Sequence, residues 1–197
     1  MPLGHWVDAQ SCDRRALRDM FGSFMTGVTV VAACNERGTP SALTANSFTS
    51  VSLDPPLILV CLAKSSTSAA VCGRAELFSV NILGGWQREL SAAFASRSPA
   101  RDAALRTLTP GSPPMVDGSL ATIACKKHQL VDAGDHIILI GSVTEFTSMA
   151  GEPLGYFRGG YVDVGSHDPK IARERPSAGE LLPEGSPVRQ KPLAARS

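Results

Sequence analysis

Short stretches of β-branched and aliphatic residues alternate with turn-forming residues along most of the chain, which is typical of a protein rich in strands. Val28–Ala33 is one such stretch. The turn residues of 35–38 separate it from a second stretch, through Ser41 to about Asn46, so the two predict a β-hairpin. The continuous apolar run Leu57–Leu62 predicts a strand that is buried on both faces. Further strands are predicted at 77–83, 120–131, 136–146 and 154–162.

Apolar positions with helical spacing occur at three places. Ser11 is placed to cap a helix that runs to about Phe24, with one apolar stripe at i, i+3, i+4 and i+7. The stripe consists of Leu17, Met20, Phe21 and Phe24. Two more short helices are predicted at 65–72 and 86–94. About seven strands and three short helices, joined by hairpin-like connections, favour a mainly β fold. We expect an antiparallel β-barrel with flanking short helices, not a doubly wound sheet.

The chain divides into three parts by composition. Its 197 residues are enough for one well-buried core and argue against two large domains. We expect a leader at 1–12, a barrel domain at 13–165 and a tail at 166–197. Within the domain, the polar connection 95–118 is long enough to be a functional lid or a poorly ordered loop. Residues 168–197 include ten charged residues, five prolines and no aromatic, so we expect the tail to be poorly ordered or draped on a partner subunit.

Charge and cysteine usage exclude several classes of function. Lys and Arg number 19 against 18 Asp and Glu, a net charge of +1, so no strong field attracts nucleic acid or an anionic membrane. No apolar run approaches the roughly 20 residues of a membrane span, and the first residues lack the pattern of a signal peptide. The five cysteines are scattered without zinc-ligand spacing. We therefore expect a cytoplasmic protein without a metal site, in which Cys61 and Cys125 are small buried apolar residues.

Two clusters of short polar side chains are the candidate chemistry, because the common catalytic and nucleotide-binding motifs are absent. In Leu43–Ser52, small residues and hydroxyls follow a strand. Such residues would let a flat ligand approach the backbone, and they are equally typical of an ordinary Ser/Thr-rich strand edge. In Lys64–Ser68, a cation and hydroxyls open a predicted helix, which suits a phosphate and equally ordinary helix capping. The two clusters flank one predicted strand, so both could face a single ligand that carries a flat ring and a phosphate.

Five segments, in order over one domain length, resemble the short-chain flavin reductases of two-component monooxygenases. The resemblance covers about 14–161 and rests on 26–31, 43–56, 78–83, Gly134-Asp135-His136 with Gly141, and 154–161. It implies the FMN-binding split barrel, a Greek-key barrel with flanking helices, and a homodimer. It also implies an NAD(P)H:flavin oxidoreductase that transfers a hydride from NADH or NADPH to FMN or FAD. The reduced flavin would pass to a separate oxygenase.

The same resemblance assigns roles to residues of both clusters. Thr44–Ser52 would hold the isoalloxazine ring through backbone amides and short side chains, and Lys64–Thr67 would hold the flavin phosphate. His136 would lie where the nicotinamide stacks on the flavin; a turn histidine that begins a strand is the alternative. Phe157 and Tyr161 would wall the pocket, serve in core packing, or both. The expected cofactor-binding residues are Thr29, Thr44, Ala45, Asn46, Ser47, Phe48, Thr49, Ser50, Val51, Ser52, Cys61, Lys64, Ser65, Ser66, Thr67, Asn81, Phe157 and Tyr161.

The chain departs from the family pattern between Ala95 and Ser112, where relatives often carry an aromatic-containing stretch. Ser96–Asp102 stands there instead, so the preference for NADH or NADPH stays open. Arginines of this connection would suit a 2′-phosphate, although solvated loop arginines are commoner; they are Arg97, Arg101 and Arg106. Three other functions fit the same barrel: a flavin-binding electron carrier or sensor without turnover, an oxidase of the pyridoxamine-phosphate type, and a purely structural protein.

Overall fold

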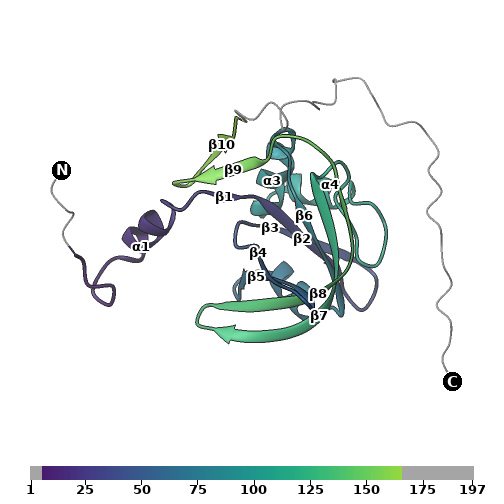
Figure 1. Cartoon of the computed structure of the whole chain (residues 1–197), viewed down its shortest axis with the longest axis horizontal. Coiled ribbons are helices and arrows are strands. Elements are labelled where there is room, and N and C mark those ends of the chain that lie inside the picture. Colours follow the sequence, from purple (N-terminus) through teal and green to yellow (C-terminus); the bar gives the residue numbers. More distant parts are fainter. Residues whose placement is uncertain (1–5, 166–197) are drawn as a thin grey trace.

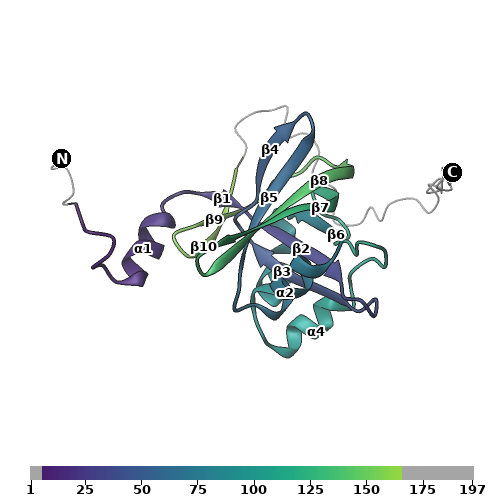
Figure 2. The same cartoon turned by 90° about the horizontal axis from the view of Figure 1, so that it is seen from below.

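A curved, seven-stranded antiparallel sheet carries the fold in the computed structural model, which describes residues 6–165 (Figures 1 and 2). Its strands are β2 (Thr29–Cys34), β3 (Pro40–Ala45), β4 (Thr49–Leu53), β5 (Pro56–Ala63), β6 (Leu77–Ile82), β7 (Ala121–Ala133) and β8 (His136–Ser148). They lie in the order β3-β2-β6-β7-β8-β5-β4, and every adjacent pair is antiparallel. The predictions of a mainly β, antiparallel fold and of the β2–β3 hairpin are confirmed.

A small sheet and several helices flank the large sheet. The small sheet has the order β1-β9-β10 and consists of β1 (Thr26–Gly27), β9 (Leu154–Phe157) and β10 (Gly160–Asp163). The helices are α1 (Arg14–Phe21), α2 (Thr67–Arg74), the 3₁₀ turn η1 (Gly85–Gln87), α3 (Arg88–Ala95) and α4 (Pro99–Leu105). Both views show α1 projecting away from the barrel (Figures 1 and 2).

Strand β2 is buried on both faces because it separates two hydrophobic cores. Val31 belongs to the core inside the barrel, together with Phe78 and residues of β5. Val30 belongs to a second core, which includes Phe94 of α3 and Ala104 of α4. Side chains alternate between the two faces of a strand, and one core covers each face of β2. Five of its six residues are therefore buried. This burial fixes the β2–β3 hairpin, whose far end leads into the functional site.

Strand β5 is buried on one face only, so the prediction that both faces of Leu57–Leu62 are buried is wrong. Ile58, Val60 and Leu62 point into the barrel, and the residues between them are half-buried. No residue of β5 belongs to the second core, so its outer face lacks the cover that α3 and α4 give to β2. Cys61 is therefore half-buried, which corrects its prediction as a buried residue. Cys125 is buried as predicted, and burial raises the pKa of its thiol to about 12.

Helix α1 is shorter than predicted. It begins after Asp13 and not after Ser11, because the Asp13 carboxylate accepts a hydrogen bond from the Arg15 N–H (3.1 Å) and caps the helix. It ends at Phe21, so Phe24 lies beyond it. The predicted apolar stripe faces solvent instead of a core: the exposed fractions are 56% for Met20, 65% for Phe21 and 77% for Phe24.

Other boundaries also differ from the sequence-based expectation. The stretch 154–162 forms two strands, since Arg158 (φ 47°) and Gly159 (φ 81°) turn the chain between β9 and β10. The polar connection 95–118 contains α4, with Ser98 in the N-cap position and Pro99 at the first helical residue. The second half of the hydroxyl-rich segment forms strand β4 at the edge of the sheet. The helix expected at 65–72 runs from Thr67 to Arg74.

Residues 1–5 of the predicted leader and the predicted tail at 166–197 lie outside the described residues. The expectations for the leader, domain and tail boundaries therefore stay predictions. Between residues 6 and 165, no helix is long and apolar enough to cross a membrane.

Gly141 of β8 lies where the barrel interior has no room for a side chain. A Cβ there would overlap the Phe78 ring and lie 2.9 Å from the Cys125 Cβ. We therefore expect Gly141→Ala to lower the free energy of unfolding by about 1–3 kcal/mol through overpacking, measured by urea denaturation. Gly27→Ala is the matched control, since nothing lies within 4 Å of its Cβ position. An equal loss in both variants would contradict this explanation.

Candidate functional site

A polar hollow of about 370 Å³ lies where the ends of β3 and β5 meet the start of α2. We call it the polar pocket. Residues 94–97 and Arg101, from α3 and its connection into α4, also line it. His136 reaches it because β8 pairs with β5 there. Of the predicted site residues, the polar pocket brings together Thr44, Ala45, Asn46, Ser47, Cys61, Ser65, Ser66, Thr67 and His136.

The Ser47 hydroxyl holds segment 46–48 against β5. It donates a hydrogen bond to the Cys61 carbonyl (2.8 Å) and accepts one from the Cys61 N–H (3.0 Å), as a neighbouring strand would. Within the described chain, the backbone N–H groups of Asn46, Ser47 and Phe48 have no acceptor. The segment therefore offers fixed backbone donors to a ligand.

Two of the predicted ligand-binding hydroxyls instead bond to the protein. Thr44 Oγ1 donates to the Ser91 carbonyl (2.7 Å) and ties β3 to α3. Thr29 Oγ1 donates to the Ala45 carbonyl (2.7 Å) and ties β2 to the end of β3. Their hydroxyls hold the walls of the site in place, and since each gives its only proton to the protein, each can meet a ligand only as an acceptor.

The first turn of α2 forms another part of the pocket wall. Ser66 Oγ accepts from the Ala69 N–H (3.3 Å) and caps the helix, so the capping alternative holds for this residue. The hydroxyls of Ser65 and Thr67 have no partner among residues 6–165. The N–H groups of Thr67 and Ser68 have no intrahelical acceptor, since they belong to the first turn. Together with the positive end of the helix dipole, these donors suit an anion such as phosphate.

Two arginines give the polar pocket positive charge. Arg97 Nη2 donates to the Ser65 carbonyl (3.2 Å), while Arg101 donates to the Ala42 carbonyl (2.7 Å) and to the Ser68 hydroxyl. No Asp or Glu lines the pocket. Neither arginine forms an ion pair with a described residue. The pocket is therefore a cationic, hydroxyl-lined site that favours an anionic ligand.

His136 stands on the wall of the polar pocket, opposite Ala63 of β5. Its Nδ1 lies 2.7 Å from the Asp135 carboxylate. The hydrogen bond and the charge of His136 lower the pKa of Asp135 below its usual value. An ionised Asp135 accepts the Nδ1 proton, which orients the ring and leaves Nε2 available to a ligand.

Lys64 does not line the polar pocket, which corrects its expected contact with a phosphate. Its Nζ donates to both carboxylate oxygens of Asp132 (2.8 and 2.7 Å) and to the Gly134 carbonyl (2.7 Å). These bonds tie the end of β5 to the turn between β7 and β8. Because His136 follows that turn, Lys64 acts as a positioning residue and not as a ligand.

Two further hollows adjoin segment 44–49. One, of about 500 Å³, is lined by Thr29, Phe48 and Thr49 together with Phe24 and Met25. The other, of about 300 Å³, shares residues 44–46 and includes Tyr161. The Tyr161 hydroxyl lies 2.8 Å from Ser91 Oγ, and its ring meets Tyr156 edge-on at 5.7 Å. Tyr161 therefore packs against the protein and also walls a hollow beside the polar pocket.

Some predicted site residues line none of these three hollows: Ser50, Val51, Ser52, Lys64, Asn81 and Phe157. Asn81 is fully buried, and its amide is used within the core: Nδ2 donates to the Val30 carbonyl (3.0 Å), and Oδ1 accepts from the Val116 N–H (2.9 Å). It is a structural amide, so its expected contact with a cofactor is corrected. Residues 50–52 lie on the edge strand β4, and Phe157 packs beneath the Arg158 guanidinium (5.3 Å).

The expected set of site residues omits Arg97 and Arg101. Both lie in the connection read from sequence as a lid or loop, and the start of α4 turns them toward the pocket. The sequence does contain a signal for this turn, because Ser98 followed by Pro99 is a common helix start.

The sequence comparisons agree with this geometry. Residues 21–165 match the family described as "Flavin reductase like domain". The chain belongs to the flavin reductase family. This confirms the resemblance found in the sequence.

Proteins similar in sequence include named reductases. This member of the family is 51% identical over 148 residues to the reductase component of the flavin-dependent trigonelline monooxygenase of Acinetobacter baylyi. That match covers 75% of this chain and 48% of the relative, so the chain spans about half the relative's length. The chain is 37% identical to the FMN reductase (NADH) SmoA of Agrobacterium fabrum, with 82% and 92% covered.

Among solved structures, the NADH:FAD oxidoreductase SgcE6 of Streptomyces globisporus C-1027 superposes with a TM-score of 0.75 at 33% identity. The match covers 84% of this chain and 100% of that one. This and other solved flavin reductases of similar structure confirm the split-barrel fold.

The Ser47 hydroxyl satisfies two backbone groups of β5, so its removal leaves both without a partner. We expect Ser47→Ala to lower the free energy of unfolding by about 1–3 kcal/mol, measured by chemical denaturation. Ser50→Ala is the matched control, because Ser50 is exposed and its hydroxyl has no partner among the described residues. We expect that variant to stay within about 0.5 kcal/mol of the wild type. A Ser47→Ala protein as stable as the control would show that the Ser47 bonds do not hold the segment.

Proposed function

We propose that this protein is an NADH-dependent flavin reductase that supplies reduced FMN or FAD to a separate monooxygenase. The observation that carries the proposal is the polar pocket. It has free backbone donors at Asn46 and Ser47, with that of Phe48 next to them, and a helix start at 65–67 beside Arg97 and Arg101, and no carboxylate lines it. A flavin nucleotide has the matching chemistry, since it joins a flat ring with carbonyl acceptors to an anionic phosphate. The relatives named for FMN, FAD and NADH support the same ligands.

A bound flavin supplies the redox chemistry, accepting a hydride from the reduced nicotinamide. The residues of the chain bind and orient. Backbone N–H groups of 46–48 would donate to the polar edge of the ring and stabilise negative charge there. Arg97, Arg101 and the first turn of α2 would hold the phosphate. His136, oriented by Asp135, would contact the nicotinamide side of the site.

The proposal includes partners. The trigonelline relative is named as the reductase component of a monooxygenase, which supports transfer of reduced flavin to a separate oxygenase. Exposed Met20, Phe21 and Phe24 on and after α1 support a homodimer, because a large exposed apolar patch is typical of a protein interface. A cytoplasmic location stays a prediction.

Replacing His136 tests the nicotinamide side of the site. We expect His136→Ala to lower kcat/KM for NADH roughly tenfold or more, a loss of about 1.4 kcal/mol in transition-state stabilisation. We expect the Kd for FMN to change less than about twofold, because the proposed flavin contacts lie elsewhere in the pocket. Steady-state NADH oxidation with FMN, FAD or riboflavin, with NADPH in parallel, and flavin fluorescence titrations measure these quantities.

His128→Ala is the matched control, since His128 is exposed on β7 and does not line the polar pocket. Equal losses of turnover and flavin affinity in His136→Ala would contradict its role. A wild-type protein that binds flavin without oxidising NADH or NADPH would be an electron carrier or sensor.

Replacing Arg97 tests the phosphate end. Arg97 is exposed, and its one described hydrogen bond goes to the Ser65 carbonyl. We expect Arg97→Met to raise the Kd for FMN roughly tenfold while riboflavin binding is unchanged, because a charge-assisted hydrogen bond contributes about 1.5–3 kcal/mol. Arg106→Met is the matched control on the same connection, since Arg106 does not line the pocket. If Arg97→Met weakened FMN and riboflavin binding equally, Arg97 would not contact the phosphate.

A further inference from the structure

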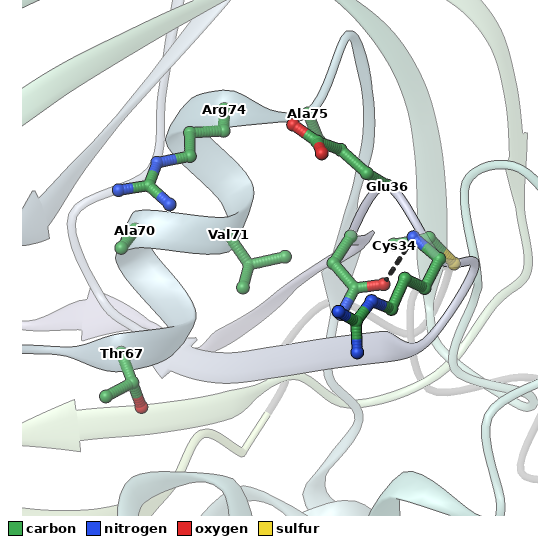
Figure 3. Close-up of a pocket in the computed structure, with 9 residues that line it drawn as sticks. Cys34, Glu36, Thr67, Ala70, Val71, Arg74 and Ala75 are labelled. Carbon is green, nitrogen blue, oxygen red and sulfur yellow. Dashed lines mark hydrogen bonds between the residues drawn. The ribbon is translucent and has the colours of Figure 1, made fainter.

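A fourth hollow, of about 440 Å³, lies along the outer face of α2 (Figure 3). We call it the α2 groove. One wall is the turn between β2 and β3, which presents Cys34 and Glu36 (Figure 3). The other wall is a single helix face, since its residues recur at i, i+3, i+4 and i+7. That face consists of Thr67, Ala70, Val71 and Arg74, with Ala75 beyond the end of the helix.

The α2 groove begins where the polar pocket ends. Thr67 lines both hollows. It belongs to the first turn of α2, which binds the flavin phosphate in the proposed function. From Thr67 to Arg74 the helix rises about 10 Å, at 1.5 Å per residue. A ligand that extends past its phosphate therefore has a continuous path along α2, with Thr67 at its start.

The chemistry of the groove matches an adenosine group. Ala70, Val71 and Ala75 give it apolar surface on which a flat base can lie. Arg37 and Arg74 also line it, and a guanidinium stacks readily on an aromatic ring or pairs with a phosphate. The Glu36 carboxylate is an acceptor of the kind that binds ribose hydroxyls. None of these three charged residues forms an ion pair within residues 6–165, so their charges are available to a ligand.

We propose that the α2 groove binds the adenosine half of FAD, so that this protein prefers FAD to FMN. The inference rests on the proposed function, because it continues the flavin from the polar pocket. Arg97 and Arg101 stand beside the helix start, where FAD carries two linked phosphates and FMN only one. NADH has the same adenosine diphosphate chemistry. However, its nicotinamide would lie against His136, which lines the polar pocket and not the α2 groove, whereas Thr67 at the proposed phosphate end of the flavin lines both. This continuity favours FAD, and the experiments below distinguish the two ligands.

A substitution that fills the groove tests the proposal. Ala70 is exposed on the middle of the helix face, so a larger side chain there occupies the groove without entering a core. We expect the wild type to bind FAD at least about tenfold more tightly than FMN, and Ala70→Trp to remove that difference. The Kd values for FMN and riboflavin should change less than about twofold. Ala70→Ser, which leaves the groove open, should keep the preference for FAD.

Three results would overturn the assignment: a wild type without a preference for FAD, an Ala70→Trp protein that keeps the preference, or an equal loss of FAD and FMN binding. A raised KM for NADH with unchanged FAD binding would also overturn it, because the groove would then hold the adenosine of the nicotinamide cofactor. If neither flavin binds the wild type, the proposed function fails as well, and riboflavin binding distinguishes that case.

The free cysteines allow a second test on the unmodified protein. Cys34 lines the α2 groove, Cys61 lines the polar pocket, and Cys12 lies in neither. We expect FAD to slow alkylation of Cys34 and Cys61, FMN to slow it at Cys61 alone, and neither flavin to protect Cys12. Burial raises the pKa of Cys34, so mildly alkaline buffer is used and rates are compared by mass spectrometry.

Protection of Cys61 without any added protection of Cys34 by FAD would overturn the groove assignment while leaving the flavin site intact. Protection of Cys34 by NADH alone would overturn it in favour of the nicotinamide cofactor. Failure of both flavins to protect Cys61 would count against the flavin site itself.

Discussion

The pair of hydrogen bonds between the Ser47 hydroxyl and the backbone of Cys61 is the contact on which the site depends. After β3 the chain must cross to β4, and one side chain takes the place of a strand partner at the end of β5. Backbone pairing across this crossing would consume the Ser47 N–H, because only alternate residues of a strand point their N–H groups at one neighbouring strand. Because Ser47 satisfies β5 from its side chain, that group stays free among residues 6–165, as do those of Asn46 and Phe48, while the segment is held in place. The barrel thereby carries a rigid row of donors at its surface.

Helix α2 links this row of donors to the rest of the binding surface. Its first turn closes the polar pocket and attracts negative charge, and its outer face forms one wall of the α2 groove. Arg97 and Arg101 come from another part of the chain and meet the same turn. Lys64 bonds to the β7–β8 turn and so holds in place the start of β8, where His136 lies. The ligand-binding elements thus converge on the short stretch between β5 and α2.

The sequence predicts local features well, because periodicity and turn chemistry are local. The β2–β3 hairpin, the strand at β6 and the helix after Ser66 all follow from such patterns, as does most of the polar pocket. Errors arise where a long-range contact decides the role of a residue. In sequence, Lys64 belongs to the cluster expected to bind a phosphate. In the structure its ammonium group instead pairs with the Asp132 carboxylate, 68 residues later. Asn81 lies in a family motif, but pairing of β6 with β2 and the approach of Val116 bury its amide.

Hydrogen–deuterium exchange at residues 46–48 is the most direct test of the central claim, that fixed backbone donors cradle the ring of a flavin. The account predicts that FMN and riboflavin slow exchange of the Asn46, Ser47 and Phe48 amides by the same factor, because both carry the same ring. Exchange at the exposed turn 35–37 should be unchanged by either ligand. Unaltered exchange at 46–48 when flavin is demonstrably bound would contradict the account, since the ring would then be held by other groups.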